Sequence, residues 1–429
     1  MSPDGCSCAN SYYDRGRRRV PEGPVGFSLV KILLLDTGRE WGGGTNSLLE
    51  LLKRIDRDRF DITVLFYEDV RKGDGPSFGT VVGSLGFPFL LKERRRIPGW
   101  AKAVKEVARV AVGWSPSLRA RAVFAVDSRW RIRADADAIA QVLREGRFDL
   151  LYMNNQPSTN LEGILAAAAC GVPSLQHARS FGSLNPAEVG IVNRHLGRMI
   201  CVSEGLRRAY AAQGVDPGRM MVVNNGIDPS ARPCRPGREV RAEMGIAQDA
   251  VVIGTVGSLM RRKHVDLLIQ ALARTAGKAG GGITGLIVGA GPERSTLEAE
   301  ARRLGMGGSC VFAGFQEEPL SFLDAMDIVA LTSESEGLPR VLLEAMLLSK
   351  PVVAMKVTGC EDLVVDGETG LLVPFGDKGK LDDALGRLAA DAAERDRMGR
   401  KGRERVLSEY TIEKYVRGVE EVFQEMPPR

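Results

Sequence analysis

The stretch Thr332-Ser-Glu-Ser-Glu336-Gly-Leu-Pro-Arg-Val-Leu-Leu-Glu344 places two glutamates on either side of a Gly-Leu-Pro-Arg turn. The preceding segment, Ala325–Leu331, is apolar and predicts a short strand, whereas Arg340–Leu348 has the apolar spacing of a helix. One carboxylate is therefore expected on a strand-to-helix loop and the other on the helix. Pro339 suits the first turn of a helix, whose exposed N–H groups favour phosphate. Acid groups for hydroxyls beside a dipole for phosphate suggest a ligand that is part sugar and part phosphate.

The first half of the chain repeats the same strand-loop-helix order. A Gly-rich loop, Gly42–Thr45, and a helix, Asn46–Ile55, follow the first expected strand. The strands are expected at Val30–Leu35, Phe60–Phe66, Asp149–Met153, Ser174–Gln176, Arg198–Val202 and Met220–Val223. Such alternation predicts a parallel sheet with helices on both faces.

A proline-rich break, Asp228–Arg238, separates this series from a second one and is expected to link two domains. The second series has a helix at Val265–Ala273. Its strands are expected at Val251–Gly257, Gly285–Val288, Cys310–Ala313, Ile328–Leu331 and Pro351–Ala354. The fold class is therefore α/β, with two doubly wound Rossmann-like domains facing each other across a cleft. Ligands of such sheets bind at the carboxyl ends of the strands.

The expected boundaries are residues 29–228 for the first domain and 229–409 for the second. Residues 1–28 are rich in Gly, Ser, Pro and Arg without a period, and we expect them to form a flexible extension. Residues 410–429 contain a segment of helical spacing, Tyr410–Gln424, that ends before Pro427.

Bulk composition favours a folded protein of the cytoplasm. The chain has 429 residues, 44% hydrophobic and 26% charged, and a formal charge of +5, which is too mild by itself to indicate nucleic acid. Its 7 cysteines are scattered, and with only 3 histidines the pair Cys6 and Cys8 does not predict a zinc site. No apolar run approaches the ~18 residues of a membrane span, and residues 1–20 lack the apolar core of a signal peptide. We expect a cytoplasmic protein, with contact to a membrane surface left open.

Four loops of the second half carry residues suited to phosphate or sugar. Gly257 in the first of them lets a phosphate approach the backbone, and Lys263 at its end supplies a positive charge. The second loop, Gly289–Glu293, is a Gly-x-Gly turn and is weak evidence alone. The third is Glu336–Glu344. The fourth, Val357–Val373, contains Asp366-Gly367 between apolar residues, which predicts a hairpin.

These four loops, in this order and at these spacings, resemble the family 4 retaining glycosyltransferases of GT-B fold (glycosyl transferases group 1). The resemblance extends from Val30 to Gln424. In the first half, Gly42–Thr45 is similar to the Gly-rich loop of the family. Asn225–Asp228 is similar to the sequence motif at the end of its first domain. The resemblance also implies that the tail helix crosses back to pack on the first domain.

The roles of the site residues follow from the resemblance. Glu344 would bind the ribose hydroxyls, and Glu336 the donor sugar, together with the backbone N–H groups of Gly337 and Leu338. Lys263 would neutralise the diphosphate leaving group, and His177, expected just after a strand, would line the sugar from the opposite domain. The remaining donor contacts would come from Gly43, Gly44, Gly257, Gly289 and Gly291. The donor would be a nucleotide diphosphate sugar, and the sugar would keep its anomeric configuration.

Two departures from the family pattern lie close to Lys263. Ser258 stands where members usually carry Arg, and His264 where Gly is frequent. Arg261 or Arg262 could supply the missing charge, and Arg262 is the residue we expect at the donor.

The resemblance requires neither a metal nor any cofactor, because a leaving phosphate oxygen is thought to take the acceptor proton. Two Asp-x-Asp matches, Asp56–Asp58 and Asp135–Asp137, lie in polar stretches and are expected to be solvated surface.

Three other classes of enzyme share parts of this pattern. A glycoside hydrolase needs carboxyl groups about 5–9.5 Å apart across one bond, whereas eight helical residues span about 12 Å. A nucleotide-dependent oxidoreductase of Rossmann type needs Gly-x-Gly-x-x-Gly, and Ser47 fills the last place after Gly42 and Gly44. A nucleotide-sugar epimerase of the same fold remains an alternative.

Residues 91–133 are strongly basic. Twelve Lys and Arg against three Asp and Glu give this segment about +9, and Trp100, Trp114 and Trp130 interleave with valines. A basic amphipathic helix with tryptophans suits an anionic membrane surface, as expected for a lipid-linked acceptor. The alternative is a basic surface over ordinary core aromatics. No motif supports nucleic-acid binding.

Overall fold

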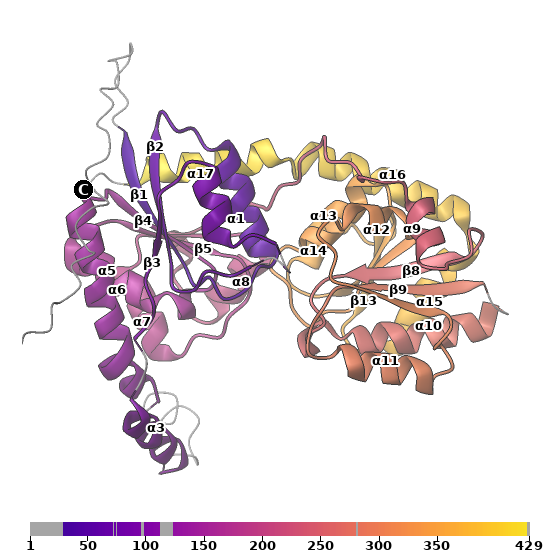
Figure 1. Cartoon of the computed structure of the whole chain (residues 1–429), viewed down its shortest axis with the longest axis horizontal. Coiled ribbons are helices and arrows are strands. Elements are labelled where there is room, and N and C mark those ends of the chain that lie inside the picture. Colours follow the sequence, from indigo (N-terminus) through magenta and orange to yellow (C-terminus); the bar gives the residue numbers. More distant parts are fainter. Residues whose placement is uncertain are drawn as a thin grey trace, which may run out of the picture.

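The computed structural model describes residues 29–426 except 72, 74, 96–97, 112–122 and 280–281. It has two α/β domains side by side, each built on one sheet (Figure 1). The first sheet has the strand order β3-β2-β1-β4-β5-β6-β7 and the second β10-β9-β8-β11-β12-β13. Neighbouring strands in both sheets run parallel. The predicted pair of doubly wound domains is confirmed. The expected extension 1–28, with Cys6 and Cys8, lies outside the described residues.

The N-terminal sheet is buried between two groups of helices. Its strands are β1 (Val30–Asp36), β2 (Phe60–Phe66), β3 (Phe89–Leu91), β4 (Leu150–Asn154), β5 (Ser174–Ala178), β6 (Arg198–Cys201) and β7 (Met220–Val222). Its helices are α1 (Gly43–Arg54), α2 (Phe78–Ser84), α3 (Gly99–Ala111), α5 (Arg133–Gly146), α6 (Leu161–Cys170), α7 (Pro186–His195) and α8 (Glu204–Ala212). Alternate residues of β1 face the two core clusters: Leu33 and Leu35 one, Ile32 and Leu34 the other. Such strands are continuous apolar runs because both faces are covered.

The C-terminal domain repeats this plan. Its strands are β8 (Val251–Val256), β9 (Ile283–Val288), β10 (Cys310–Gly314), β11 (Ile328–Leu331), β12 (Val352–Lys356) and β13 (Gly370–Pro374). Its helices are α9 (Gly237–Glu243), α10 (Val265–Ala279), α11 (Arg294–Arg303), α12 (Leu320–Asp324), α13 (Arg340–Leu347), α14 (Cys360–Leu363), α15 (Lys378–Ala390) and α16 (Ala392–Glu409).

Two local predictions in this domain are wrong. The Asp366-Gly367 turn does not form a hairpin, because it joins α14 to β13, which pairs with β12 in parallel. The strand before Glu336 is also shorter than expected. Ala325 is the C-cap of α12, and Met326 packs over Gly254 of β8, so these apolar residues are buried before the strand begins at Ile328.

The chain crosses between the domains twice, and the two crossings are hydrogen-bonded to each other. Ile227 donates from its N–H to the carbonyl of Tyr410 (2.9 Å) and accepts from the N–H of Ile412 (2.9 Å). The tail helix α17 (Ile412–Glu425) then returns along the N-terminal domain (Figure 1). Phe423 on its buried face packs edge-on against Phe60 of β2. The C-terminal helix is therefore part of the N-terminal core.

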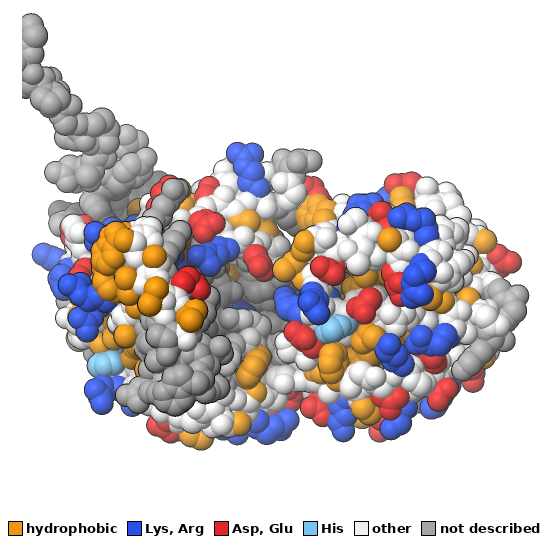
Figure 2. Space-filling view, turned by 90° about the horizontal axis from the view of Figure 1, so that it is seen from below, with side chains coloured by type: hydrophobic (Ala, Val, Ile, Leu, Met, Phe, Trp, Pro, Cys, Tyr) orange, Lys and Arg blue, Asp and Glu red, His pale blue; other side chains and the backbone are white. Residues whose placement is uncertain are grey.

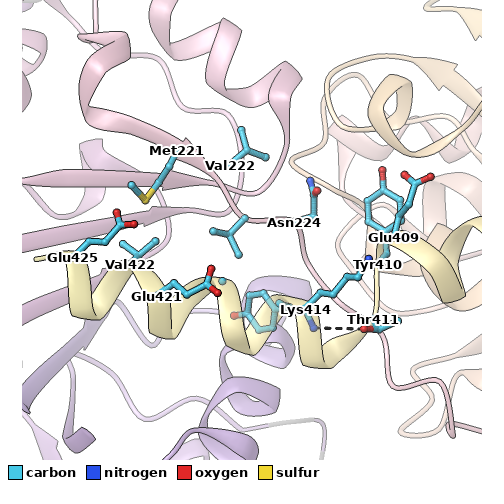
Figure 3. Close-up of a pocket in the computed structure, with 13 residues that line it drawn as sticks. Met221, Val222, Asn224, Glu409, Tyr410, Thr411, Lys414, Glu421, Val422 and Glu425 are labelled. Atoms are coloured by element: carbon cyan, nitrogen blue, oxygen red, sulfur yellow. Dashed lines mark hydrogen bonds between the residues drawn. The ribbon is translucent and has the colours of Figure 1, made fainter. Parts of the chain in front are cut away.

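A cavity of about 330 Å³ lies between β7 and α17, beside this crossing (Figure 3). Lys414 and Thr411 line the end of the cavity next to the crossing, whereas Met221, Val422 and Glu425 line the end farther along α17. The Thr411 side chain caps α17 by accepting a hydrogen bond from the N–H of Lys414 (3.4 Å). The cap fixes the direction in which α17 leaves the crossing.

Candidate functional site

Loops at the carboxyl ends of β8 and β9 pack directly on one another. The N–H of Leu259 donates to the carbonyl of Ala290 (2.8 Å), and the N–H of Glu293 donates to the carbonyl of Leu259 (3.1 Å). A Cβ added at Gly289, where φ is +139°, would lie 1.8 Å from the carbonyl oxygen of Gly257. Gly289 is therefore required for loop packing, and Gly291 makes a similar approach to Leu259. Gly257 differs, because a Cβ there would meet nothing within 4 Å, which leaves open space beside its Cα.

Lys263 and Glu336 form an ion pair at this edge of the sheet. Lys263 ends a short 3-10 turn, η4 (Arg261–Lys263), and its Nζ lies 2.6 Å from Oε1 of Glu336. Their side chains are only 17% and 10% exposed. The Thr332 hydroxyl donates to the carbonyls of Lys263 (3.0 Å) and His264 (2.8 Å), which ties the β11 loop to η4. The structure thus brings together two of the three residues expected to carry out the reaction.

The turn after Glu336 offers two hydrogen-bond donors. Within the described part of the chain, the backbone N–H groups of Gly337 and Leu338 donate to no protein acceptor. Both residues are buried between the domains. Pro339 precedes the first residue of α13 instead of lying within its first turn. Unpaired N–H groups just before a helix are suited to anionic or hydroxyl ligands.

Glu344 lies one turn into α13 and is 14% exposed. Arg340, one turn earlier, approaches it with Nη2 3.4 Å from Oε1. Arg340 also reaches the N-terminal domain, where it donates to the carbonyl of Gly226 (3.3 Å). Sequence reasoning missed this role. A signal existed, since a cation in the first turn of a helix opposes the helix dipole and needs a partner.

The Gly-rich loop forms part of the opposite side of the cleft. The helix α1 begins at Gly43, three residues earlier than expected. A Cβ at Gly43 would lie 3.7 Å from Cδ of Arg340, and one at Gly44 would lie 3.3 Å from Cγ of Arg179. The predicted glycines therefore face both an arginine of the second domain and one of the first.

His177 does not line the cleft in this structure. The strand β5 continues to Ala178, two residues beyond the expected end, because it keeps pairing with β4 and β6. His177 is therefore fully buried, with Nδ1 2.7 Å from the hydroxyl of Tyr152. Burial holds the pKa of His177 well below its usual value, and the Arg179 guanidinium lowers it further. The imidazole is neutral and belongs to the core, and the strand ends next to Arg179.

The remaining predicted polar residues divide between the surface and the interior. Arg262 is exposed, and its carbonyl accepts from the N–H of Glu334 (3.0 Å). Asp135 is buried, contrary to the expected solvated surface, because it accepts from the N–H of Arg95 (3.0 Å) in the segment that leads to α3. The described residues include no group of three or more Asp, Glu, His or Cys side chains placed to hold a metal ion.

A hollow of about 740 Å³ opens beside η4, between α10 and α11. Arg261, His264 and Glu300 are among the residues that line it, so its charge is mixed. Lys263 and Glu336 are not part of this hollow, which lies beside the candidate site and not in it.

The chain matches two family models that together span both domains. Residues 41–231 match the model described as Glycosyltransferase Family 4, and residues 237–405 match the model described as Glycosyl transferases group 1. The boundary between the matches falls in the predicted linker.

Curated relatives are similar over part of the chain. Lipopolysaccharide core biosynthesis glycosyltransferase LpsE of Rhizobium meliloti is 33% identical over 173 residues, which are 40% of this chain and 49% of the relative. The chain thus spans about half the length of that relative. Alpha-maltose-1-phosphate synthase of Mycolicibacterium smegmatis is 32% identical over 289 residues, which are 59% of this chain and 73% of that protein.

Solved structures share the whole architecture. HepE of Anabaena, crystallised with UDP-glucose, has a TM-score of 0.74 and 23% identity, and the match covers 92% of this chain and all of that one. The lipopolysaccharide outer core galactosyltransferase WaaB in its apo form has a TM-score of 0.67. At identities of 23% for HepE and 17% for WaaB, this likeness shows the fold alone. Together with the family models and the relative matched over 73% of its length, it shows that the chain belongs to the family 4, group 1 glycosyltransferases of GT-B fold.

Proposed function

We propose that this glycosyltransferase moves a sugar, with retention of configuration, from a nucleotide diphosphate sugar to a hydroxyl of a lipid-linked or polysaccharide acceptor in cell-envelope glycan synthesis. The observation that carries the proposal is the Lys263–Glu336 pair beside the free N–H groups of Gly337 and Leu338. HepE crystallised with UDP-glucose supports the donor class. The relative named for lipopolysaccharide core biosynthesis supports the pathway.

The donor would lie along the loop and helix that follow β11. Glu344 would accept hydrogen bonds from the ribose hydroxyls, and Glu336 from the hydroxyls of the sugar. Lys263 would stay paired with Glu336 through one N–H and have two further N–H donors for the diphosphate. Each glutamate would thus hold a different part of one ligand.

Breaking the sugar–phosphate bond places positive charge on the sugar ring and negative charge on the diphosphate. Lys263 and the N–H groups before α13 are already fixed by the fold, so they would stabilise the leaving group at little reorganisation cost. A phosphate oxygen would take the acceptor proton on the face from which it leaves, which gives retention without a protein base. The domain contacts at Gly337 and Arg340 would exclude water.

A nucleotide-sugar panel tests this proposal. The protein is mixed with UDP- and GDP-sugars, with and without lipid-linked or oligosaccharide acceptors, and product configuration is read by proton NMR. We expect one donor to give an acceptor-dependent product whose anomeric configuration matches the donor. No product with any donor, alongside clear binding of NAD, would favour an oxidoreductase. An inverted product would contradict retention alone.

Replacing Glu344 by glutamine is expected to weaken nucleoside diphosphate binding by about 10- to 100-fold, because hydrogen bonds to a charged group contribute about 1.5–3 kcal/mol. The side chain keeps its shape, so folding should be preserved. Titration calorimetry with UDP and GDP measures the effect. Glu298→Gln is the matched control, since Glu298 also pairs with an arginine one helical turn away, on the exposed face of α11. Equal affinities in wild type and Glu344→Gln would exclude the ribose contact.

The helix α3 is proposed to contact an anionic membrane surface. Trp100, Val107 and Val110 are 59%, 67% and 79% exposed, although they form the apolar side of the helix. Figure 2 shows hydrophobic side chains gathered on this projecting part, with Lys and Arg side chains near it.

Not all of the basic residues of this region are available to a membrane, because Arg94 and Arg131 pair with buried Glu162. Residues 96–97 and 112–122, which include Trp114, lie outside the described part. No described helix is both long and apolar enough to cross a bilayer.

Vesicle flotation tests this contact. Wild type is expected to float with vesicles rich in anionic lipid and to stay behind with neutral ones. The double variant Trp100→Ala/Val107→Asp should reduce the bound fraction at least fivefold, since it removes apolar area and adds a negative charge. Leu407→Ala, on the exposed face of α16, is the control for a surface apolar residue elsewhere. Equal flotation of both variants would refute the role of α3.

A further inference from the structure

Arg179 is a buried guanidinium at the junction of the two domains. Its residue is only 7% exposed. Its Nε donates to Oδ1 of Asn154 at the end of β4 (2.7 Å), and Nη1 donates to Oδ1 of Asn225 at the domain crossing (3.0 Å). Its Nη2 donates to the hydroxyl of Tyr415 on α17 (2.8 Å). A planar fork therefore joins a strand end, the interdomain crossing and the tail helix.

The main chain of Arg179 touches the donor loop directly. A Cβ added at Gly337 would lie 2.0 Å from the carbonyl oxygen of Arg179, so the two backbones are in close contact. The next residue, Leu338, is held through the same cluster, because its carbonyl accepts from Nδ2 of Asn225 (3.1 Å). The stem of the Arg179 side chain also lies against Gly44 of the Gly-rich loop. Both sides of the cleft thus meet at one residue.

A buried carboxyl group is joined to this cluster through side-chain amides. Asp36 is buried at the end of β1 and accepts from the side-chain amides of Asn154 and Asn155. Oδ1 of Asn154 accepts from Nε of Arg179, so this amide links Asp36 to the guanidinium through two hydrogen bonds. A buried network of this kind is stable only when all its members are paired. Withdrawing α17 or Asn225 would leave N–H groups of Arg179 unpaired in the interior.

We propose that Arg179 is a positioning residue of sugar transfer, which fixes the Gly337–Leu338 turn against the N-terminal domain and ties the placement of that turn to the docking of α17. Arg179 acts on the reaction through the turn that presents the two free N–H groups and follows Glu336. The inference rests on the proposed function. The inference adds Arg179 to the site. The sequence had instead predicted His177, two positions earlier, beside the sugar.

Two substitutions test this role at different depths. Arg179→Lys keeps the charge, but an ammonium cannot reach three acceptors in the directions of a planar fork. Tyr415→Phe removes one acceptor hydroxyl and leaves the packing of α17 in place. We expect kcat to fall at least 10-fold in Arg179→Lys and about threefold in Tyr415→Phe. The affinity for UDP or GDP should stay within about threefold of wild type, since the nucleotide is held by the C-terminal domain.

The double variant and a matched arginine separate positioning from stability. Arg179→Lys/Tyr415→Phe should lower kcat no further than Arg179→Lys alone, because both act through one contact. Arg241→Lys is the control, since Arg241 is a little-exposed arginine that bonds Ala325, Ala250 and Asp327 far from the cleft. It should lower the melting temperature without lowering kcat.

The outcomes distinguish this inference from the function on which it rests. If wild type transfers sugar and the kcat of Arg179→Lys lies within twofold of the wild-type kcat, the positioning role is overturned and the proposed function stays intact. A fall in the kcat of Arg179→Lys that is matched by an equal fall in nucleotide affinity and in folded fraction would mean that Arg179 only stabilises the fold. That result would also overturn the positioning role. Absence of transfer by wild type with every donor would overturn the proposed function, and the positioning role with it.

Discussion

Replacing Glu336 by glutamine is expected to lower kcat by about 100- to 1000-fold, the range seen when one preorganised transition-state contact is removed. The carboxylate is 10% exposed and fixed by Lys263 at 2.6 Å, so it is oriented before a donor arrives. Glutamine keeps the shape of the side chain but lacks the negative charge that would stabilise the positive charge on the sugar ring. Affinity for the nucleoside diphosphate should change by less than about threefold, because Glu344 and Lys263 are untouched.

Steady-state kinetics with the donor found in the panel, together with calorimetry of UDP or GDP, measure both quantities. Glu334→Gln is the control in the same loop, since Glu334 is two residues away and its side chain is 50% exposed. It should keep at least half of the wild-type kcat. A Glu336→Gln enzyme with a third or more of the wild-type kcat would mean that the carboxylate has no role at the sugar.

Replacing Lys263 by methionine is expected to weaken nucleoside diphosphate binding by about 10- to 100-fold and to lower kcat by at least 100-fold. The ammonium would contact the charge that grows on the leaving group, so its contribution is larger in the transition state than in the ground state. The same change strips Glu336 of its partner. Removing one partner of a buried pair costs about 3–5 kcal/mol, and the slight exposure of this pair places the loss at the low end.

The stability effect provides an internal check on the kinetic one. The double variant Lys263→Met/Glu336→Gln should unfold at higher urea concentration than Lys263→Met alone, because it leaves no unpaired charge. Its kcat should nevertheless stay as low as that of either single variant. A double variant that recovered both stability and turnover would show that the pair serves the fold alone.

The strands and the chemical loops could be predicted because their signals are local. Apolar runs such as Phe60–Phe66 were placed to the residue, and Lys263 and Glu336 were identified 73 positions apart as parts of one site. In a parallel sheet, the loops that follow the strands lie together at the carboxyl edge. Each loop could therefore be interpreted from its own sequence and then assigned to one shared site. The Asp-Gly turn at Asp366 was misassigned, since the same turn can join a helix to a strand.

Residues whose role depends on distant segments of the chain could not be predicted. His177 and Arg179 lie two positions apart and are both buried, and the length of β5 decides which one meets the junction between the domains. Arg340 stands inside the most informative stretch, yet its acceptor on Gly226 is 114 residues away. Asp135 is buried because a segment 40 residues upstream folds over it. Such contacts are fixed by packing between distant segments, so a local pattern can indicate that a residue needs a partner but not which residue supplies it.

Release of nucleoside diphosphate is the most direct test of the whole account. Wild type and Glu336→Gln are incubated with the same nucleotide sugar, with and without acceptor, and the free diphosphate is counted against the sugar transferred. We predict one diphosphate per sugar transferred by wild type, only in the presence of acceptor, and at least 100-fold slower release by Glu336→Gln. Release by wild type that is independent of any acceptor, or equal in the variant, would contradict transfer at this site.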